Sequence, residues 1–257
     1  DQLTITAAGL DMPAKSGVSE LSLPSLPYAG DLTWLDNRLS LIGRFNVPQV
    51  SYGDYAADTF VSSGSYQVAS ESIEIATEFA VNRLEGLPER IDSAVDDRIQ
   101  GSIDARYLIA DERLEESVLE LTSGEHRIDL AGTRSSDGTL DIAGAFALAA
   151  VSVLEQASGS WTVQGRPSDG LLASLQGAVS PAPSLPELAT LIGPRADIKV
   201  QIRSASDSVL IETAELRSDI VSATARGNIS ADEIAISARA AADRLAYAPV
   251  TSDALEI

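Results

Sequence analysis

Residues 140–148 read Leu-Asp-Ile-Ala-Gly-Ala-Phe-Ala-Leu, with an apolar side chain or a glycine at every second position. Successive side chains of a β-strand point to opposite faces, so this spacing predicts a strand with one apolar face. Residues 39–47 and 171–179 show the same alternation. The period of two therefore decides the expected fold class, which is mostly β.

Shorter stretches with the same alternation follow one another along the chain. They are Leu3-Ile5-Ala7, Ile73-Ile75, Ile128-Leu130-Gly132, Trp161-Val163-Gly165, Ile198-Val200-Ile202 and Ile234-Ile236-Ala238. Turn-forming triplets such as Ser136-Asp137-Gly138 and Ser168-Asp169-Gly170 separate some of them. Short strands joined by tight turns predict a long antiparallel meander.

Helical signals are few and local. Residues 184–194 combine a serine cap, an early proline and glutamate, and a Gly-Pro stop, which predicts about two turns of helix. Residues 84–95 are a second candidate for a short helix. Residues 111–121 have apolar side chains at helical spacing, but the following Gly124 and an internal repeat favour a strand there.

The chain is also similar to itself. An offset of 95 carries Leu121, Ser123, Gly132 and Asp137 onto Leu216, Ser218, Gly227 and Asp232. An offset of 161 carries Ile73 and Ile75 onto Ile234 and Ile236. Divergent copies of one β unit predict stacking by repetition, so we expect one elongated segment over residues 1–257 with sub-repeats 1–110 and 111–257.

Glycine recurs in phase with the apolar side chains, at Gly43, Gly132, Gly144, Gly165 and Gly177. Glycine weakens the interior of a strand, so its repeated use on one face indicates a bend or a close approach of two backbones. A meander bent in this way predicts a folded-over sheet with an apolar groove.

Composition excludes several classes of function. The chain has 18 Lys and Arg against 38 Asp and Glu, a net charge of −20, which disfavours binding to nucleic acid or to anionic headgroups. It has no cysteine and one histidine, so disulfides, iron–sulfur ligation and the common zinc sites are excluded. We expect neither a cofactor nor a metal.

No constellation of catalytic residues stands out. His126 lies at an expected turn, where a surface role is the ordinary one, and no Gly-x-Ser-x-Gly elbow accompanies it. Most carboxylates alternate with apolar residues, as Asp141 does, which places them on the solvated face. We expect a non-enzymatic protein. An enzyme acting on polysaccharides would instead need a cluster of exposed carboxylates, for example around Asp137 and Asp141.

Three segments stand out: Gly132–Gly144, Gly159–Gly165 and the expected helix Leu185–Gly193 that leads into Ala196–Ile202. They resemble the TamB family of the Gram-negative cell envelope, which belongs to the AsmA-like group related to bridge-like lipid-transfer proteins. The resemblance implies an elongated, U-shaped sheet, the β-taco, anchored at the inner membrane and reaching through the periplasm. It also implies transfer of phospholipid between membranes and cooperation with an outer-membrane assembly barrel. The anchoring helix of the family is missing here, so we expect an internal segment.

Together these observations predict that the apolar face carries phospholipid acyl chains. The scarcity of aromatic residues, 5% of the chain, suits an aliphatic groove better than a filled core. The alternative is a closed structural or adhesive β-repeat scaffold without lipid. The expected groove residues are Leu39, Leu41, Phe45, Ile73, Ile75, Leu130, Leu140, Ile142, Phe146, Leu171, Leu175, Val179, Ile198, Val200, Ile202, Ile234 and Ile236.

Overall fold

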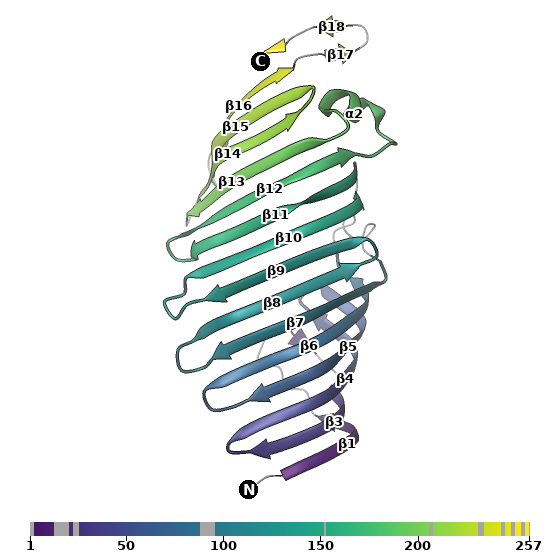
Figure 1. Ribbon diagram of the computed structural model, residues 1–257, viewed down its shortest axis with the longest axis vertical. Coiled ribbons are helices and arrows are strands. Elements are labelled where there is room, and N and C mark those ends of the chain that lie inside the picture. The colour runs from purple at the N-terminus through teal and green to yellow at the C-terminus, as the bar shows by residue number, and fades with distance from the viewer. Residues whose placement is uncertain are drawn as a thin grey trace. The chain divides into compact units, whose positions relative to one another are not determined.

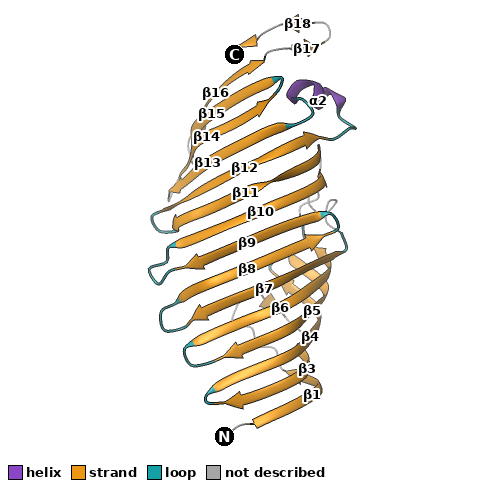
Figure 2. Cartoon of the chain, in the orientation of Figure 1, coloured by secondary structure: helices purple, strands orange, loops and turns teal. Residues whose placement is uncertain are grey.

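The computed structural model describes most of the chain as β-strands, drawn orange in Figure 2. The described residues are 3–12, 21–22, 26–87, 96–151, 153–205, 208–230, 234–242, 245–247, 250–252 and 255–256. The chain divides into two units, Asp1–Ser136 and Asp137–Ile257, which we call unit 1 and unit 2. The predicted boundary between sub-repeats after residue 110 stays a prediction.

Unit 1 is an antiparallel sheet in which each long strand pairs with the next one along the chain (Figure 1). Its strands are β1 (Leu3–Met12), β2 (Leu21–Ser22), β3 (Leu26–Leu35), β4 (Arg38–Tyr52), β5 (Tyr55–Val68), β6 (Ser72–Glu85), β7 (Arg98–Leu108), β8 (Arg113–Ser123) and β9 (His126–Arg134). The short β2 is the exception, because it pairs with the last residues of β4 while β1 pairs directly with β3.

Unit 2 repeats this arrangement with one helix inserted between strands. Its elements are β10 (Leu140–Val151), β11 (Leu154–Arg166), β12 (Gly170–Pro181), α2 (Pro186–Ile192), β13 (Ala196–Ala205), β14 (Ser208–Ser218), β15 (Val221–Ser230), β16 (Ile234–Ala242), β17 (Leu245–Tyr247), β18 (Val250–Ser252) and β19 (Leu255–Glu256). β10 to β16 pair in chain order, β19 pairs with the end of β16, and β17 and β18 form a separate pair.

The predicted fold class is confirmed: the described chain is an antiparallel, open β structure with one short helix. The predicted helix in residues 184–194 is α2, and residues 113–121 of the ambiguous stretch belong to β8. The predicted helix over residues 84–95 is wrong at its start, because Leu84 still belongs to β6 and pairs with Ala57 of β5. Cross-strand pairing outweighs local helical spacing there. Residues 88–95 lie outside the described part.

The internal repeat has a structural counterpart. β8 and β14 begin and end 95 residues apart, matching the offset found in the sequence. Each strand carries one extra residue relative to its neighbour, Glu115 in β8 and Glu212 in β14, which makes a β-bulge. Each glutamate contacts an arginine of the preceding strand: Arg106 lies 3.0 Å from Glu115, and Arg203 lies 2.8 Å from Glu212.

The strands of unit 1 change direction along a line that crosses β4, β5 and β6. Gln49 in β4 and Arg83 in β6 have left-handed φ angles of 54° and 49°, which ordinary strands do not adopt. Val47 and Val50, which flank this line in β4, are both less exposed than the two residues between them. Residues three apart in a regular strand would point to opposite faces, so this break re-aims the strand toward one side. Ala150 of β10, with a φ of 50°, marks a similar point in unit 2.

Candidate functional site

Cross-strand pairs trace one face of unit 1 from strand to strand, because directly opposed side chains lie on the same side of a sheet. β5 pairs with both β4 and β6, which are the two strands of unit 1 with the most predicted groove residues. The pairs from β6 to β9 extend the face to the end of the unit. The apolar face of unit 1 contains the predicted Leu39, Leu41, Phe45, Ile73, Ile75 and Leu130.

The apolar face of unit 2 is traced in the same way from β10 to β16. Gly165 connects Leu140 to Leu171, and Gly227 connects β14 to Ile236. This face contains the predicted Leu140, Ile142, Phe146, Leu171, Leu175, Val179, Ile198, Val200, Ile202, Ile234 and Ile236.

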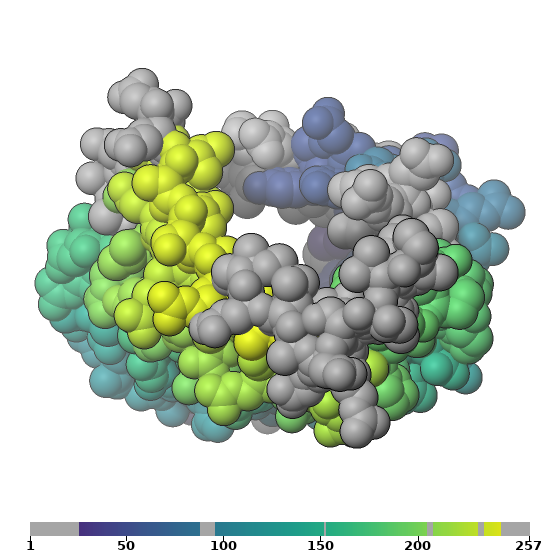
Figure 3. All heavy atoms as spheres, turned by 90° about the horizontal axis from the view of Figure 1, so that it is seen from above, coloured from purple at the N-terminus to yellow at the C-terminus, as the bar shows by residue number. Residues whose placement is uncertain are grey.

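Neither apolar face is packed away as a protein core. Within the described part, the buried apolar residues are Tyr28, Val47, Ala57, Ala157, Ala196 and Ala242. None of the predicted groove residues is buried, and Ile234 and Ile236 of β16 are 72% and 52% exposed. Residues of β16 are visible as yellow spheres at the surface of unit 2 in Figure 3. Two sheets packed face to face would interdigitate and bury such side chains, so the predicted groove residues are not packed in this way.

The opposite face of each sheet is polar and solvated. In β10, Asp141, Ala143, Ala145 and Ala147 alternate with the apolar residues and are exposed. The ion pairs of the two units join exposed or half-exposed groups, for example Arg127 with Asp129 at 2.9 Å, and exposed pairs add little stability. Both tryptophans lie on apolar faces, since Trp34 is opposite Leu39 and Trp161 is opposite Gly144.

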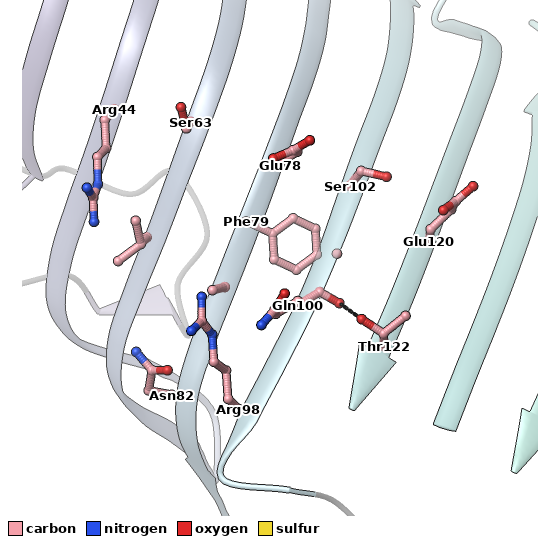
Figure 4. Close-up of a pocket in the computed structure, with 13 residues that line it drawn as sticks. Arg44, Ser63, Glu78, Phe79, Asn82, Arg98, Gln100, Ser102, Glu120 and Thr122 are labelled. Atoms are coloured by element: carbon pink, nitrogen blue, oxygen red, sulfur yellow. Dashed lines mark hydrogen bonds between the residues drawn. The ribbon is translucent and has the colours of Figure 1, made fainter. Parts of the chain in front are cut away.

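A hollow of about 640 Å³ lies on the polar face of unit 1 (Figure 4). Its lining combines Arg44 and Arg98 with Glu78 and Glu120, so its formal charge is balanced. Figure 4 shows these side chains on separate strands of the same sheet, spread over its surface. A hollow of this kind lacks the convergence of several groups on one point that a catalytic site requires.

Asp137, named above for the enzyme alternative, and His126 both lie at turns. Asp137 accepts a hydrogen bond from the Thr139 amide at 3.0 Å and contacts Arg166. The hydrogen bonds from Thr139, with a smaller effect of Arg166, lower the pKa of Asp137 from its usual value. His126 begins β9 directly after a turn. Among the described residues, no group of three or more His, Cys, Asp or Glu side chains is arranged to hold a metal ion.

In the part of the chain that the structure describes, no helix is long and apolar enough to cross a bilayer. Comparison of the chain with protein-family models, with curated proteins and with solved structures returns no match. The geometry of the two apolar faces is therefore the basis for inferring a function.

Sequence reasoning missed several residues of the unit 1 face. Tyr28, Ser62, Tyr66 and Thr77 were not among the expected groove residues, although each lies on that face by cross-strand pairing. The alternation of residues 28–34, Tyr-x-Gly-x-Leu-x-Trp, is a signal that could have identified Tyr28. Ser62 and Thr77 gave no such signal, because a polar residue breaks the alternating pattern.

Proposed function

We propose that this chain is a non-enzymatic segment of a TamB-like or AsmA-like envelope protein, and that its apolar faces carry phospholipid acyl chains. One observation carries the proposal. Every expected groove residue lies on the apolar face of its unit, and none of them is buried by the chain itself. An apolar face of this extent needs a partner, and monomeric proteins rarely leave such surfaces uncovered.

Acyl chains suit these faces because binding them requires apolar surface area and no directional contacts such as hydrogen bonds. Each methylene that leaves water gains about 0.8 kcal/mol, so ten methylenes of one chain would gain about 8 kcal/mol before the cost of ordering it. Leucine, isoleucine, valine and alanine dominate the face of unit 2, and their contacts impose no specific geometry on a tail. No polar site is needed to hold it.

The charge distribution supports contact through the apolar faces alone. The net charge of −20 disfavours flat adsorption of the polar faces to anionic lipid. Lipid would therefore meet the protein as separate molecules seated on an apolar face. The same acidic surface keeps a protein with uncovered apolar faces soluble.

The setting of this function follows from the resemblance to TamB. We propose a periplasmic location, as part of a protein anchored in the inner membrane, with movement of phospholipid between the inner and outer membranes. Cooperation with an outer-membrane assembly barrel belongs to the same proposal. The competing function, a closed scaffold or adhesive repeat, requires buried apolar side chains, and the partial exposure of the predicted groove residues favours the lipid carrier.

A photocrosslinking residue tests the proposal at Ile142, on the apolar face of β10. The matched control is Ala143, the next residue of the same strand, which is exposed on the polar face. After expression in the periplasm of a Gram-negative host, we expect phospholipid adducts at position 142 and none at position 143, and native mass spectrometry of the unmodified chain should show bound phospholipid. A lipid-free protein without adducts at position 142 would refute the proposal.

A further inference from the structure

Three aromatic rings gather on the apolar face of unit 1. The ring centres of Tyr28 and Phe45 lie 5.0 Å apart, and those of Phe45 and Tyr66 lie 5.1 Å apart in an edge-to-face arrangement. Tyr28 is 1% exposed. Aromatic pairs at this separation attract each other beyond the effect of burial alone. The three residues come from β3, β4 and β5, so the cluster spans adjacent strands of the face.

Glycine makes room for this cluster. Gly30 pairs with Gly43, and Gly43 pairs with Gly64, which gives a row without side chains across β3, β4 and β5. A methyl group on Gly43 would lie 2.9 Å from Cε2 of Tyr28, and one on Gly30 would lie 2.8 Å from the Tyr28 hydroxyl oxygen. The ring of Tyr28 therefore lies over the glycines, in the space that an acyl chain would need.

Hydroxyl groups fix the cluster in place. Tyr28 donates a hydrogen bond to the carbonyl oxygen of Asp31 at 2.8 Å. The Ser62 and Tyr66 hydroxyls lie 2.6 Å apart, and the Tyr66 and Thr77 hydroxyls lie 2.9 Å apart. Ser62 is only 3% exposed. Polar groups that satisfy one another in a buried network rigidify it, and separating them would leave unpaired groups.

Unit 2 has no comparable cluster among its described residues. Its buried apolar residues are Ala157, Ala196 and Ala242, and none of them is aromatic. At the glycine pair of unit 2, Gly159 and Gly177, the nearest atoms to an added methyl group are all backbone atoms. The two apolar faces thus differ: a cluster of rings covers part of the unit 1 face, and the described residues of unit 2 form no such cluster.

We propose that Tyr28, Phe45, Ser62, Tyr66 and Thr77 form an aromatic plug that excludes acyl chains from the glycine-lined part of unit 1. This inference rests on the proposed lipid-carrying function. Acyl chains seat on the face of unit 2 and on the part of unit 1 beyond the plug. An acyl chain that moves past β3, β4 and β5 must first displace the Tyr28 ring, so the plug controls the passage of lipid along this face.

Thiol labelling tests whether the plug is closed, without any lipid. The chain has no cysteine, so Ser62→Cys introduces a single thiol at a buried position of the cluster. Ser117→Cys is the matched control, because Ser117 lies on the same face in β8 and away from the cluster. We expect Ser62→Cys to react with a water-soluble maleimide at least tenfold more slowly than Ser117→Cys. Equal rates would overturn the proposal.

Opening the plug should raise the maleimide reaction rate of Ser62→Cys and leave that of Ser117→Cys unchanged. Tyr28→Ala should raise the reactivity of Ser62→Cys at least tenfold and leave Ser117→Cys unchanged. Tyr28→Phe keeps the ring and should keep the thiol protected. If Tyr28→Ala lowers the melting temperature so far that the protein is unfolded at the labelling temperature, Tyr28→Leu serves as the smaller opening. A folded variant without the ring that still protects the thiol would contradict the plug.

A phospholipid with a photoreactive acyl chain separates this proposal from the proposed function. In the wild-type chain we expect adducts on the apolar face of unit 2 and none at Phe45 or Ser62, and we expect adducts at these two positions in Tyr28→Ala. Adducts at Phe45 or Ser62 in the wild type would refute the plug and leave the carrier function standing. Absence of adducts from the whole chain in both proteins would refute the carrier function, and with it the exclusion of lipid by the plug.

Discussion

Replacing Gly43 by alanine tests the close packing on the apolar face of unit 1. The added methyl group would lie 2.4 Å from the carbonyl oxygen of Ala29 and 2.8 Å from the Cα atom of Gly30. Ordinary contact begins at 3.4 Å, so the oxygen would have to move by 3.4 − 2.4 = 1.0 Å. Both atoms belong to the backbone of β3, which cannot rotate away as a flexible side chain could.

The expected cost follows from two opposing effects. Forcing extra volume into a packed region costs about 1–3 kcal/mol, and a backbone clash of this size places Gly43→Ala near 3 kcal/mol. Alanine also restricts the unfolded chain, which returns about 0.4–1 kcal/mol. The steric effect is the larger one, so we expect a net loss of about 2 kcal/mol. With an m-value of about 2 kcal/mol per molar urea, the unfolding midpoint should fall by about 1 M.

Urea unfolding followed by Trp34 fluorescence measures this loss. Trp34 belongs to β3, so in a Trp161→Phe background the signal reports on unit 1 alone. Ser63→Ala is the matched control, since Ser63 is exposed on the polar face of β5, and its midpoint should change by less than the equivalent of about 0.5 kcal/mol. A Gly43→Ala variant as stable as this control would refute the close approach of β3 and β4.

Three further predictions concern stability. Chemical denaturation should show a loss of about 2 kcal/mol in unfolding free energy for Val47→Ala, at a site 1% exposed, and of less than about 1 kcal/mol for Ile236→Ala, at a site 52% exposed. Equally large losses would indicate a closed core. Burial, followed by the charge of Asp31, raises the pKa of Tyr28, so the neutral side chain stabilises the fold below the usual tyrosine pKa and this stability is lost as pH rises above it. Tyr28→Phe should remove this part of the alkaline loss of stability in a pH series of melting temperatures. The lowered pKa of Asp137 gives stability that is present above its usual pKa of 3.8 and lost as pH falls, so Asp137→Asn should show a smaller acid loss than the wild type.

The prediction of the sheet from the sequence succeeded because one physical rule governs it. Alternation of apolar and polar residues specifies which face each side chain occupies, and a register slip of one residue would move every apolar side chain to the polar face. Leu140 and Ile142 could therefore be placed on one face without coordinates. The prediction of a helix from Leu84 onward was wrong at that residue, because Leu84 pairs with Ala57 of the neighbouring strand.

The bend lines and the aromatic plug could not be predicted in this way. Gln49 and Arg83 adopt left-handed conformations that their residue types do not predict, because the neighbouring strands impose them. Ser62 looked like a break in an apolar pattern, yet it is 3% exposed and its hydroxyl lies 2.6 Å from the Tyr66 hydroxyl.

By itself, the sequence determined the class of this protein: an acidic, antiparallel β chain with one aliphatic face, because side-chain alternation is a local property of each strand. Only the tertiary structure decided how open that face is at each point. Burial depends on what other strands bring near a residue, and Tyr28 lies over Gly43 because β3 and β4 meet there. The same alternating pattern is thus compatible with an open face in unit 2 and a partly filled face in unit 1.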